Sequence, residues 1–93
     1  MSGTAGPPQG GPFVYPQAYP LKVIGLAAGD FAAHALRLVE RAAGAEAVEP
    51  VTVRESGQGK YHSVTVVVVL QSESQRLAVY AALRSDSRVV YAL

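Results

Sequence analysis

The chain has 93 residues, enough for one small domain, and with 49% hydrophobic and 16% charged residues its composition is that of a folded protein. The net charge is +1 and the charges are scattered singly, so no basic block favours a nucleic acid or an anionic membrane. Cysteine is absent, which excludes disulfides, zinc ribbons and thiol chemistry. The longest apolar run, residues 66–70, cannot cross a bilayer, and no signal-peptide pattern is present, so we expect a cytoplasmic location.

Residues 1–14 are rich in glycine and proline, a composition that loses much entropy on ordering and gains little from packing. We therefore expect a flexible tail over 1–14 and a single domain over 15–93. The first element of that domain is a strand over residues 19–26, in which Leu21, Val23 and Gly25 alternate with the residues between them.

A helix is predicted to begin at Asp30, whose carboxylate is expected to cap it, and to end at Gly44 in a left-handed conformation. Its apolar stripe follows helical spacing and consists of Phe31, Ala35, Leu38, Val39 and Ala42. Its outer face would carry His34, Arg37 and Arg41.

The second half of the chain repeats the alternation of strand and helix. A short strand around Val51 and Val53 leads through a glycine turn, residues 56–60, into a strand over 61–70 that is apolar on both faces and is typical of a central strand. A second helix starts at a capping box formed by Ser72 and Gln75 and runs to about Arg84, with Val79, Tyr80 and Leu83 facing inward. A last strand covers residues 89–93.

The order β-α-β-β-α-β predicts an α+β, ferredoxin-like fold: a four-stranded antiparallel sheet with both helices on one face. Right-handed crossovers place the first and third strands in the centre.

Several motifs resemble a known family. Tyr15-Pro16 and Lys22-Val23-Ile24-Gly25 are similar to its opening segments, and the run from Gly59 to Thr65 is similar to its turn and strand. The family is that of the small bacterial YbeD-like proteins, described as lipoic acid-binding regulatory proteins, and the resemblance covers about residues 15–93. Arg76 departs from it, because it stands where the family has an apolar residue. The resemblance implies an ACT-like fold and a regulatory role in which lipoate or a lipoyl group is bound.

Strand parity gives a candidate binding surface. If the even-numbered residues of the third strand face the helices, then Tyr61, Ser63 and Thr65 face the other way, and Lys22 shares their side. Lys22 and Lys60 are the only lysines, and either could pair with the carboxylate of lipoate. The alternative is that Lys22 only keeps an exposed strand soluble and that Lys60 lies in solvent.

Other residues support plainer interpretations. Gly57 and Gly59 precede a strand rather than a helix, so they form a turn and not a phosphate loop. Two histidines without cysteine argue against a metal site, and His62 is expected to point toward the helices and bond to the backbone. Gly29, before Asp30, lies where ACT modules place a ligand loop, but the Asp30 carboxylate would repel an anion there and could only meet an amine.

No nucleophile, paired carboxylates or cofactor motif is recognisable, so we expect no enzyme activity and no cofactor. The sequence favours a regulatory module that binds a lipoate-like small molecule. The alternative is a protein-interaction domain, a homodimer among the options, that pairs through its sheet without a small ligand. A third alternative is RNA binding, but Tyr61 stands alone where RNA-recognition domains carry several aromatics.

Overall fold

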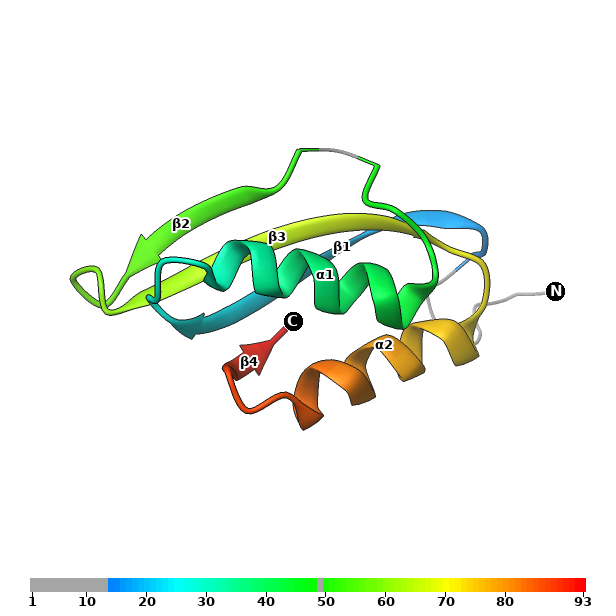
Figure 1. Ribbon diagram of the computed structural model, residues 1–93. Helices are drawn as coiled ribbons and strands as arrows, with labels where there is room; N and C mark the ends of the chain where they lie inside the picture. Colours follow the sequence, from blue (N-terminus) through cyan, green and yellow to red (C-terminus); the bar gives the residue numbers. More distant parts are fainter. Residues whose placement is uncertain (1–13, 49) are drawn as a thin grey trace, which may run out of the picture.

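The computed structural model describes residues 14–48 and 50–93, so most of the predicted flexible tail lies outside the described residues. Its elements are β1 (Gln17–Leu26), α1 (Phe31–Ala43), β2 (Thr52–Ser56), β3 (Tyr61–Leu70), α2 (Glu73–Ser85) and β4 (Val89–Ala92). The strands form one antiparallel sheet in the order β2-β3-β1-β4, so the first and third strands are central as predicted. Both helices lie on one face of this sheet and contact each other (Figure 1). The expected ferredoxin-like fold is confirmed.

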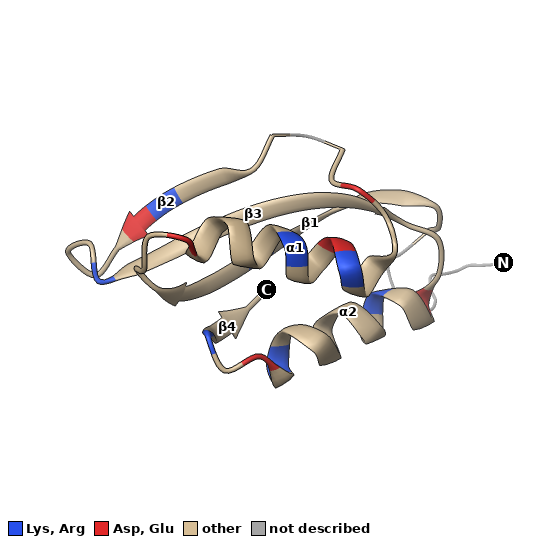
Figure 2. Cartoon of the chain, viewed as in Figure 1, with Lys and Arg blue, Asp and Glu red and all other residues tan. Residues whose placement is uncertain are grey.

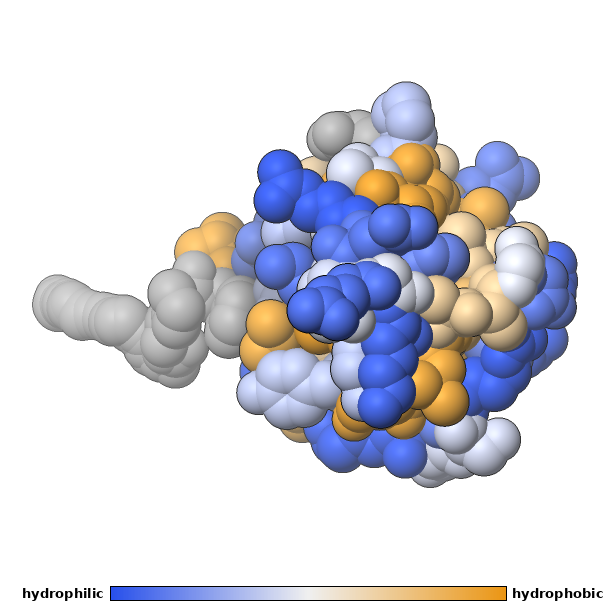
Figure 3. Space-filling view, turned by 90° about the vertical axis from the view of Figure 1, so that its left-hand side faces the viewer, coloured by the Kyte–Doolittle hydropathy of each residue, from blue (hydrophilic) through white to orange (hydrophobic). Residues whose placement is uncertain are grey.

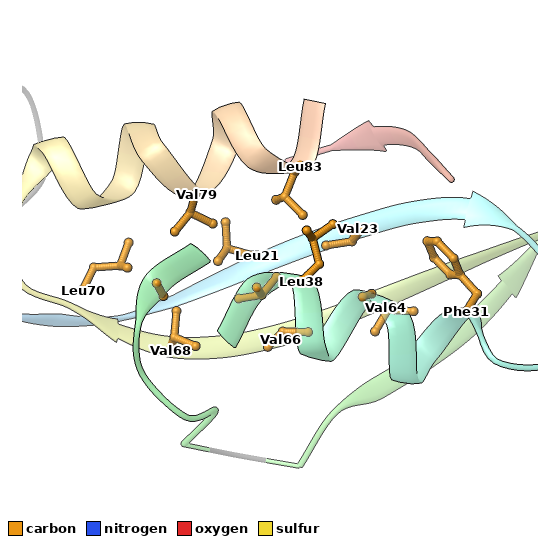
Figure 4. Packing of buried hydrophobic residues seen from close by; sticks show 13 residues of the cluster. Leu21, Val23, Phe31, Leu38, Val64, Val66, Val68, Leu70, Val79 and Leu83 are labelled. Carbon is orange, nitrogen blue, oxygen red and sulfur yellow. The ribbon is translucent and has the colours of Figure 1, made fainter. Parts of the chain in front are cut away.

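The core lies between the helices and the sheet, as Figure 4 shows. The sheet side of the core follows from the period-two alternation of strands. Leu21 and Val23 of β1 are fully buried, and so is every second residue of β3 from Val64 to Leu70. The helix side of the core consists of Phe31, Ala35, Leu38, Val39, Ala43, Val79 and Leu83. The predicted stripe of α1 is correct except near its end, where Ala43 is buried and Ala42 only half-buried.

Pro20 stands in a central strand, although proline cannot donate a ladder hydrogen bond. The register explains why it is tolerated. Lys22 exchanges backbone hydrogen bonds with Leu93, so the backbone of Pro20, two residues earlier, faces the same side as that of Lys22. On that side the β1–β4 pairing extends only as far as Leu93, so no ladder partner lies beside Pro20 among the described residues.

The helix ends agree with prediction at two points and differ at two. Gly44 ends α1 with φ 67°, the left-handed conformation expected of it, and the Ser72 hydroxyl accepts the Gln75 N–H at the start of α2. The side chain of Gln75 does not complete a capping box, because it accepts the N–H of Gln71 instead. The prediction for Asp30 was wrong: it precedes α1, but its carboxylate makes no capping bond and reaches Arg88.

Two further predictions need correction. His34 was expected on the outer face of α1, but it is half-buried against Asp86. His62 was expected to bond to the backbone, but its Nε2 lies 3.8 Å from the Glu55 carboxylate across the β2–β3 ladder. β2 is exposed along its whole length, because neither helix extends over it, and Val53 keeps 44% of its surface open.

Candidate functional site

The side of the sheet away from the helices, called the open face here, holds most of the predicted site. The register places its residues in rows: Lys22, Thr65 and Thr52; then Ile24, Ser63 and Arg54; then Leu26, Tyr61 and Ser56. Tyr61, Ser63, Thr65 and Lys22 therefore share one surface, as parity predicted. This follows directly from the alternation of β3, whose intervening residues are buried under the helices.

Lys60 does not join Lys22. It precedes Tyr61 at the β2–β3 turn, where its Nζ lies 5.7 Å from the centre of the Tyr61 ring. Lys22 pairs with Thr65, and roughly 13 Å of strand separates Tyr61 from Thr65. The two lysines therefore do not converge on a single carboxylate, and the predicted residues form a surface rather than a pocket.

The charge on the open face has one sign. Lys22 and Arg54 are the only charged residues of the described part of this face, and no carboxylate lies in its rows. Figure 2 shows that most other charges are dispersed over the helices and turns, and Glu55 is on β2. Val67 and Val69 continue the open face toward the start of β1 and are half-buried, so this surface is partly aliphatic.

A hollow of about 260 Å³ lies at one end of the sheet, between the loop after β1 and the loop before β4. It is lined by Leu26, Ala28, Ser87, Arg88 and Val90. Leu26 and Val90 are exposed, so the hollow has an aliphatic wall open to solvent, and Arg88 adds a guanidinium beside it. Figure 3 looks at this end of the molecule and shows hydrophobic surface next to strongly hydrophilic surface.

Gly25 allows the two loops to approach each other. A Cβ at this position would lie 2.4 Å from the Phe31 ring and 2.5 Å from the Arg88 carbonyl oxygen. The β1–β4 register also shifts between Ile24 and Gly25, which is the irregularity expected where a strand contains such a glycine. The last residue of Lys22-Val23-Ile24-Gly25 is therefore glycine because the first turn of α1 and the loop before β4 both contact its backbone.

The loops at the hollow are joined by an ion pair. Arg88 donates to both carboxylate oxygens of Asp30, at 2.8 and 3.3 Å, and its guanidinium lies 5.7 Å from the Phe31 ring centre. The hydrogen bonds and charge of Arg88 lower the pKa of Asp30, and those of Asp30 raise the pKa of Arg88. The guanidinium at the hollow is thus shared with a carboxylate at the start of α1.

A second contact fixes the same loop. His34 Nε2 lies 2.9 Å from Asp86 Oδ2, and the other oxygen of Asp86 accepts the backbone N–H of Arg88 at 2.9 Å. Burial raises the pKa of Asp86, but the bonds from His34 and from the Arg88 N–H outweigh burial and lower it. Asp86 therefore connects α1 to the loop that carries Arg88.

Sequence reasoning did not identify Arg88, Leu26 or Val90 as site residues. Their contribution depends on two loops that meet only in the folded chain. The one local signal was Gly25, because a glycine inside an otherwise regular strand indicates a close backbone approach.

In the described residues no group of three or more His, Asp or Glu could hold a metal ion. Neither α1 nor α2 is long and apolar enough to cross a membrane.

Residues 12–93 match a protein family described as "Protein of unknown function (DUF493)". The chain belongs to this family. Relatives in it carry the name UPF0250, and it is the YbeD-like family that the motifs resemble. A UPF0250 protein of Pseudomonas aeruginosa is 34% identical over 73 residues, which are 78% of each chain. One of Ralstonia nicotianae is 33% identical over 85 residues, which are 91% of this chain and 88% of the relative.

A solved structure has a similar fold. The solution structure of protein HP0495 from H. pylori superposes with a TM-score of 0.65 and covers 88% of this chain and 86% of its own. At 20% identity this likeness concerns the fold alone. It supports the ferredoxin-like architecture, and a shared fold does not determine function.

Proposed function

We propose that this DUF493 chain is a non-enzymatic binding module that holds a small amphipathic carboxylate in the hollow beside Arg88. The observation that carries the proposal is the lining of the hollow, where the aliphatic side chains of Leu26 and Val90 meet a guanidinium. An aliphatic chain would cover the first two, and a carboxylate would accept hydrogen bonds from the third. Lipoate is the first ligand of this class to test, because of the family resemblance.

Binding of a free ligand is expected to be weak. The hollow is smaller than the 300 Å³ or so at which ligand pockets usually begin, and Asp30 competes for the guanidinium. A ligand of about a dozen non-hydrogen atoms that gains roughly 0.3 kcal/mol from each would bind in the millimolar range. A lipoyl group attached to a protein is an amide without the free carboxylate, so it would keep only the aliphatic contacts in the hollow and would depend on further contacts outside it.

A titration followed by two-dimensional amide NMR tests the proposal. Lipoate and octanoate should shift the amides of Leu26, Ala28 and Arg88, and lipoamide, which lacks the charge, should shift them less. Arg88→Met should abolish saturation, whereas Lys22→Met and Lys60→Met should not. Shifts centred on Lys22 and Tyr61 would instead support the site predicted from the sequence, and an absence of shifts at several millimolar would refute a small-ligand role.

The open face favours a second candidate, docking of a partner protein without a small ligand. Its two cations, its lack of carboxylates and the aliphatic Val67 and Val69 match a partner surface that is acidic and partly apolar. An isolated lipoyl-bearing protein domain is a suitable probe. Shifts at Thr65 and Val67 that are lost with Arg54→Glu would support docking on the open face, and shifts confined to the hollow would exclude it.

A further inference from the structure

The two edges of the sheet are protected differently. The outer strand β2 carries Arg54 and Glu55, and charged side chains on an edge strand oppose pairing with another strand. The outer strand at the other side, β4, has no charged residue from Val89 to Leu93. Val90, Tyr91 and Leu93 in this segment are each more than half exposed, at 59%, 58% and 51%. β4 is therefore an apolar edge without the usual protection.

The backbone of Ala92 in β4 is free to pair outward. Leu93 exchanges two hydrogen bonds with Lys22, at 3.0 and 2.8 Å, so its N–H and C=O face β1. Because these groups alternate along a strand, the N–H and C=O of Ala92 face away from β1. The described chain supplies no further strand on that side. Toward the start of β4 the ladder is interrupted, since the register shifts opposite Ile24 and Gly25.

We propose that β4 pairs antiparallel with β4 of a second copy of this chain, with Ala92 opposite Ala92 of that copy across a two-fold axis. The outward groups of the two Ala92 residues then satisfy each other. Tyr91 and Leu93 share the open face, and this register places Tyr91 opposite Leu93 of the second copy. Two exposed apolar side chains on each copy become buried in aromatic–aliphatic pairs.

A second copy fits this edge for three reasons. The side chains of the segment are uncharged, so self-pairing brings no like-charged side chains together, whereas self-pairing of β2 centred on Arg54 or on Glu55 would. The register shift opposite Gly25 confines pairing to the last residues of β4, which selects Ala92 as the centre. A domain of 93 residues also buries a limited share of its surface alone and gains from pairing. The pairing does not require a ligand in the hollow.

Sedimentation equilibrium of the full chain gives the first test. The wild type should approach twice the 9.7 kDa chain mass as its concentration rises, and Tyr91→Lys should stay at the single-chain mass. Tyr91 is exposed, so this substitution leaves the core intact, which the amide NMR spectrum of the variant would verify. A wild type that remains a monomer at millimolar concentration, or a Tyr91→Lys variant that still dimerises, would overturn the proposal.

Single-cysteine variants test the register, because the natural chain has no cysteine. Opposed residues of a hydrogen-bonded pair lie about 5.5 Å apart, within the range that a disulfide spans. Ala92→Cys should therefore form disulfide-linked dimers on mild oxidation. Val53→Cys, at the exposed opposite edge, is the matched control and should cross-link far more slowly. Equal cross-linking of the two variants would show random collision instead of pairing through β4.

Discussion

Asp30 and Arg88, 58 residues apart in the sequence, form a two-point ion pair that joins the start of α1 to the loop before β4. The carboxylate expected to cap a helix is therefore used to hold the loop that lines the hollow. The arrangement gives the hollow a guanidinium and, at the same time, a built-in competitor for it. Removal of the Asp30 charge should therefore raise the affinity for a carboxylate ligand, and removal of the Arg88 charge should lower it.

Gly25→Ala should destabilise the fold. The added Cβ would lie 2.4 Å from the Phe31 ring and 2.5 Å from the Arg88 carbonyl, so one of them must move. Overpacking of this kind costs about 1–3 kcal/mol of unfolding free energy, which urea denaturation would measure.

Gly29→Ala is the matched control for this substitution. Nothing lies within 4 Å of its Cβ position, so its unfolding free energy should change by about 0.5 kcal/mol or less. Equal effects of the two substitutions would contradict the close approach at Gly25.

Leu83→Ala should cost about 2–5 kcal/mol of unfolding free energy, because Leu83 is fully buried between α2 and the sheet and its truncation leaves a cavity. Leu77→Ala on the same helix is the control. Leu77 is 52% exposed, so its truncation should change stability by about 0.5 kcal/mol or less. Denaturant unfolding of both variants checks whether α2 has the orientation described. Similar losses at the two positions would show that it does not.

Glu73 should titrate far below an ordinary glutamate. Hydrogen bonds from Arg76, and then from the Tyr15 hydroxyl, lower its pKa from 4.5 to about 2. Because the pKa of Glu73 is lower in the folded than in the unfolded chain, ionised Glu73 stabilises the fold. This stabilisation is complete above pH 4.5 and is lost as the pH falls from 4.5 toward 2. Carboxyl ¹³C NMR should follow this titration.

Two variants separate the causes of the Glu73 shift. Arg76→Gln should return the pKa of Glu73 most of the way to 4.5, and Tyr15→Phe should raise it by less, because the bonds from Arg76 are the larger influence. A wild-type Glu73 that already titrates near 4.5 would argue against both contacts.

The fold was predictable because its signals are local. Alternation along β1 and helical spacing in α1 each show, within ten or so residues, which side is buried, and Gly44 ends its helix through its own conformational freedom. Prediction failed where a distant residue competed for a side chain. Asp30 satisfies the local rule for a cap, but Arg88 takes its carboxylate. His34 satisfies the rule for an outer face, but Asp86 lies beside it.

The candidate site was predictable only in part. Parity placed Tyr61, Ser63 and Thr65 on one surface, since it needs only the alternation of a single strand. Parity could not show that Lys60 lies away from Lys22, because that depends on the register between β1 and β3. The hollow depends on the meeting of two loops, and Gly25 is its one local signal in the sequence. The ligand-binding role of the predicted residues stays a prediction.

The most direct test of the proposed function is the lipoate affinity of Asp30→Asn relative to the wild type, measured by amide NMR titration. Asp30 makes no capping bond and Asp86 also fixes the loop that carries Arg88, so the substitution leaves the start of α1 unchanged and this loop held while it frees the Arg88 guanidinium. We predict several-fold tighter binding with shifts at Leu26, Ala28 and Arg88. Unchanged or weaker binding by Asp30→Asn would show that Arg88 does not hold the carboxylate and would contradict the proposal.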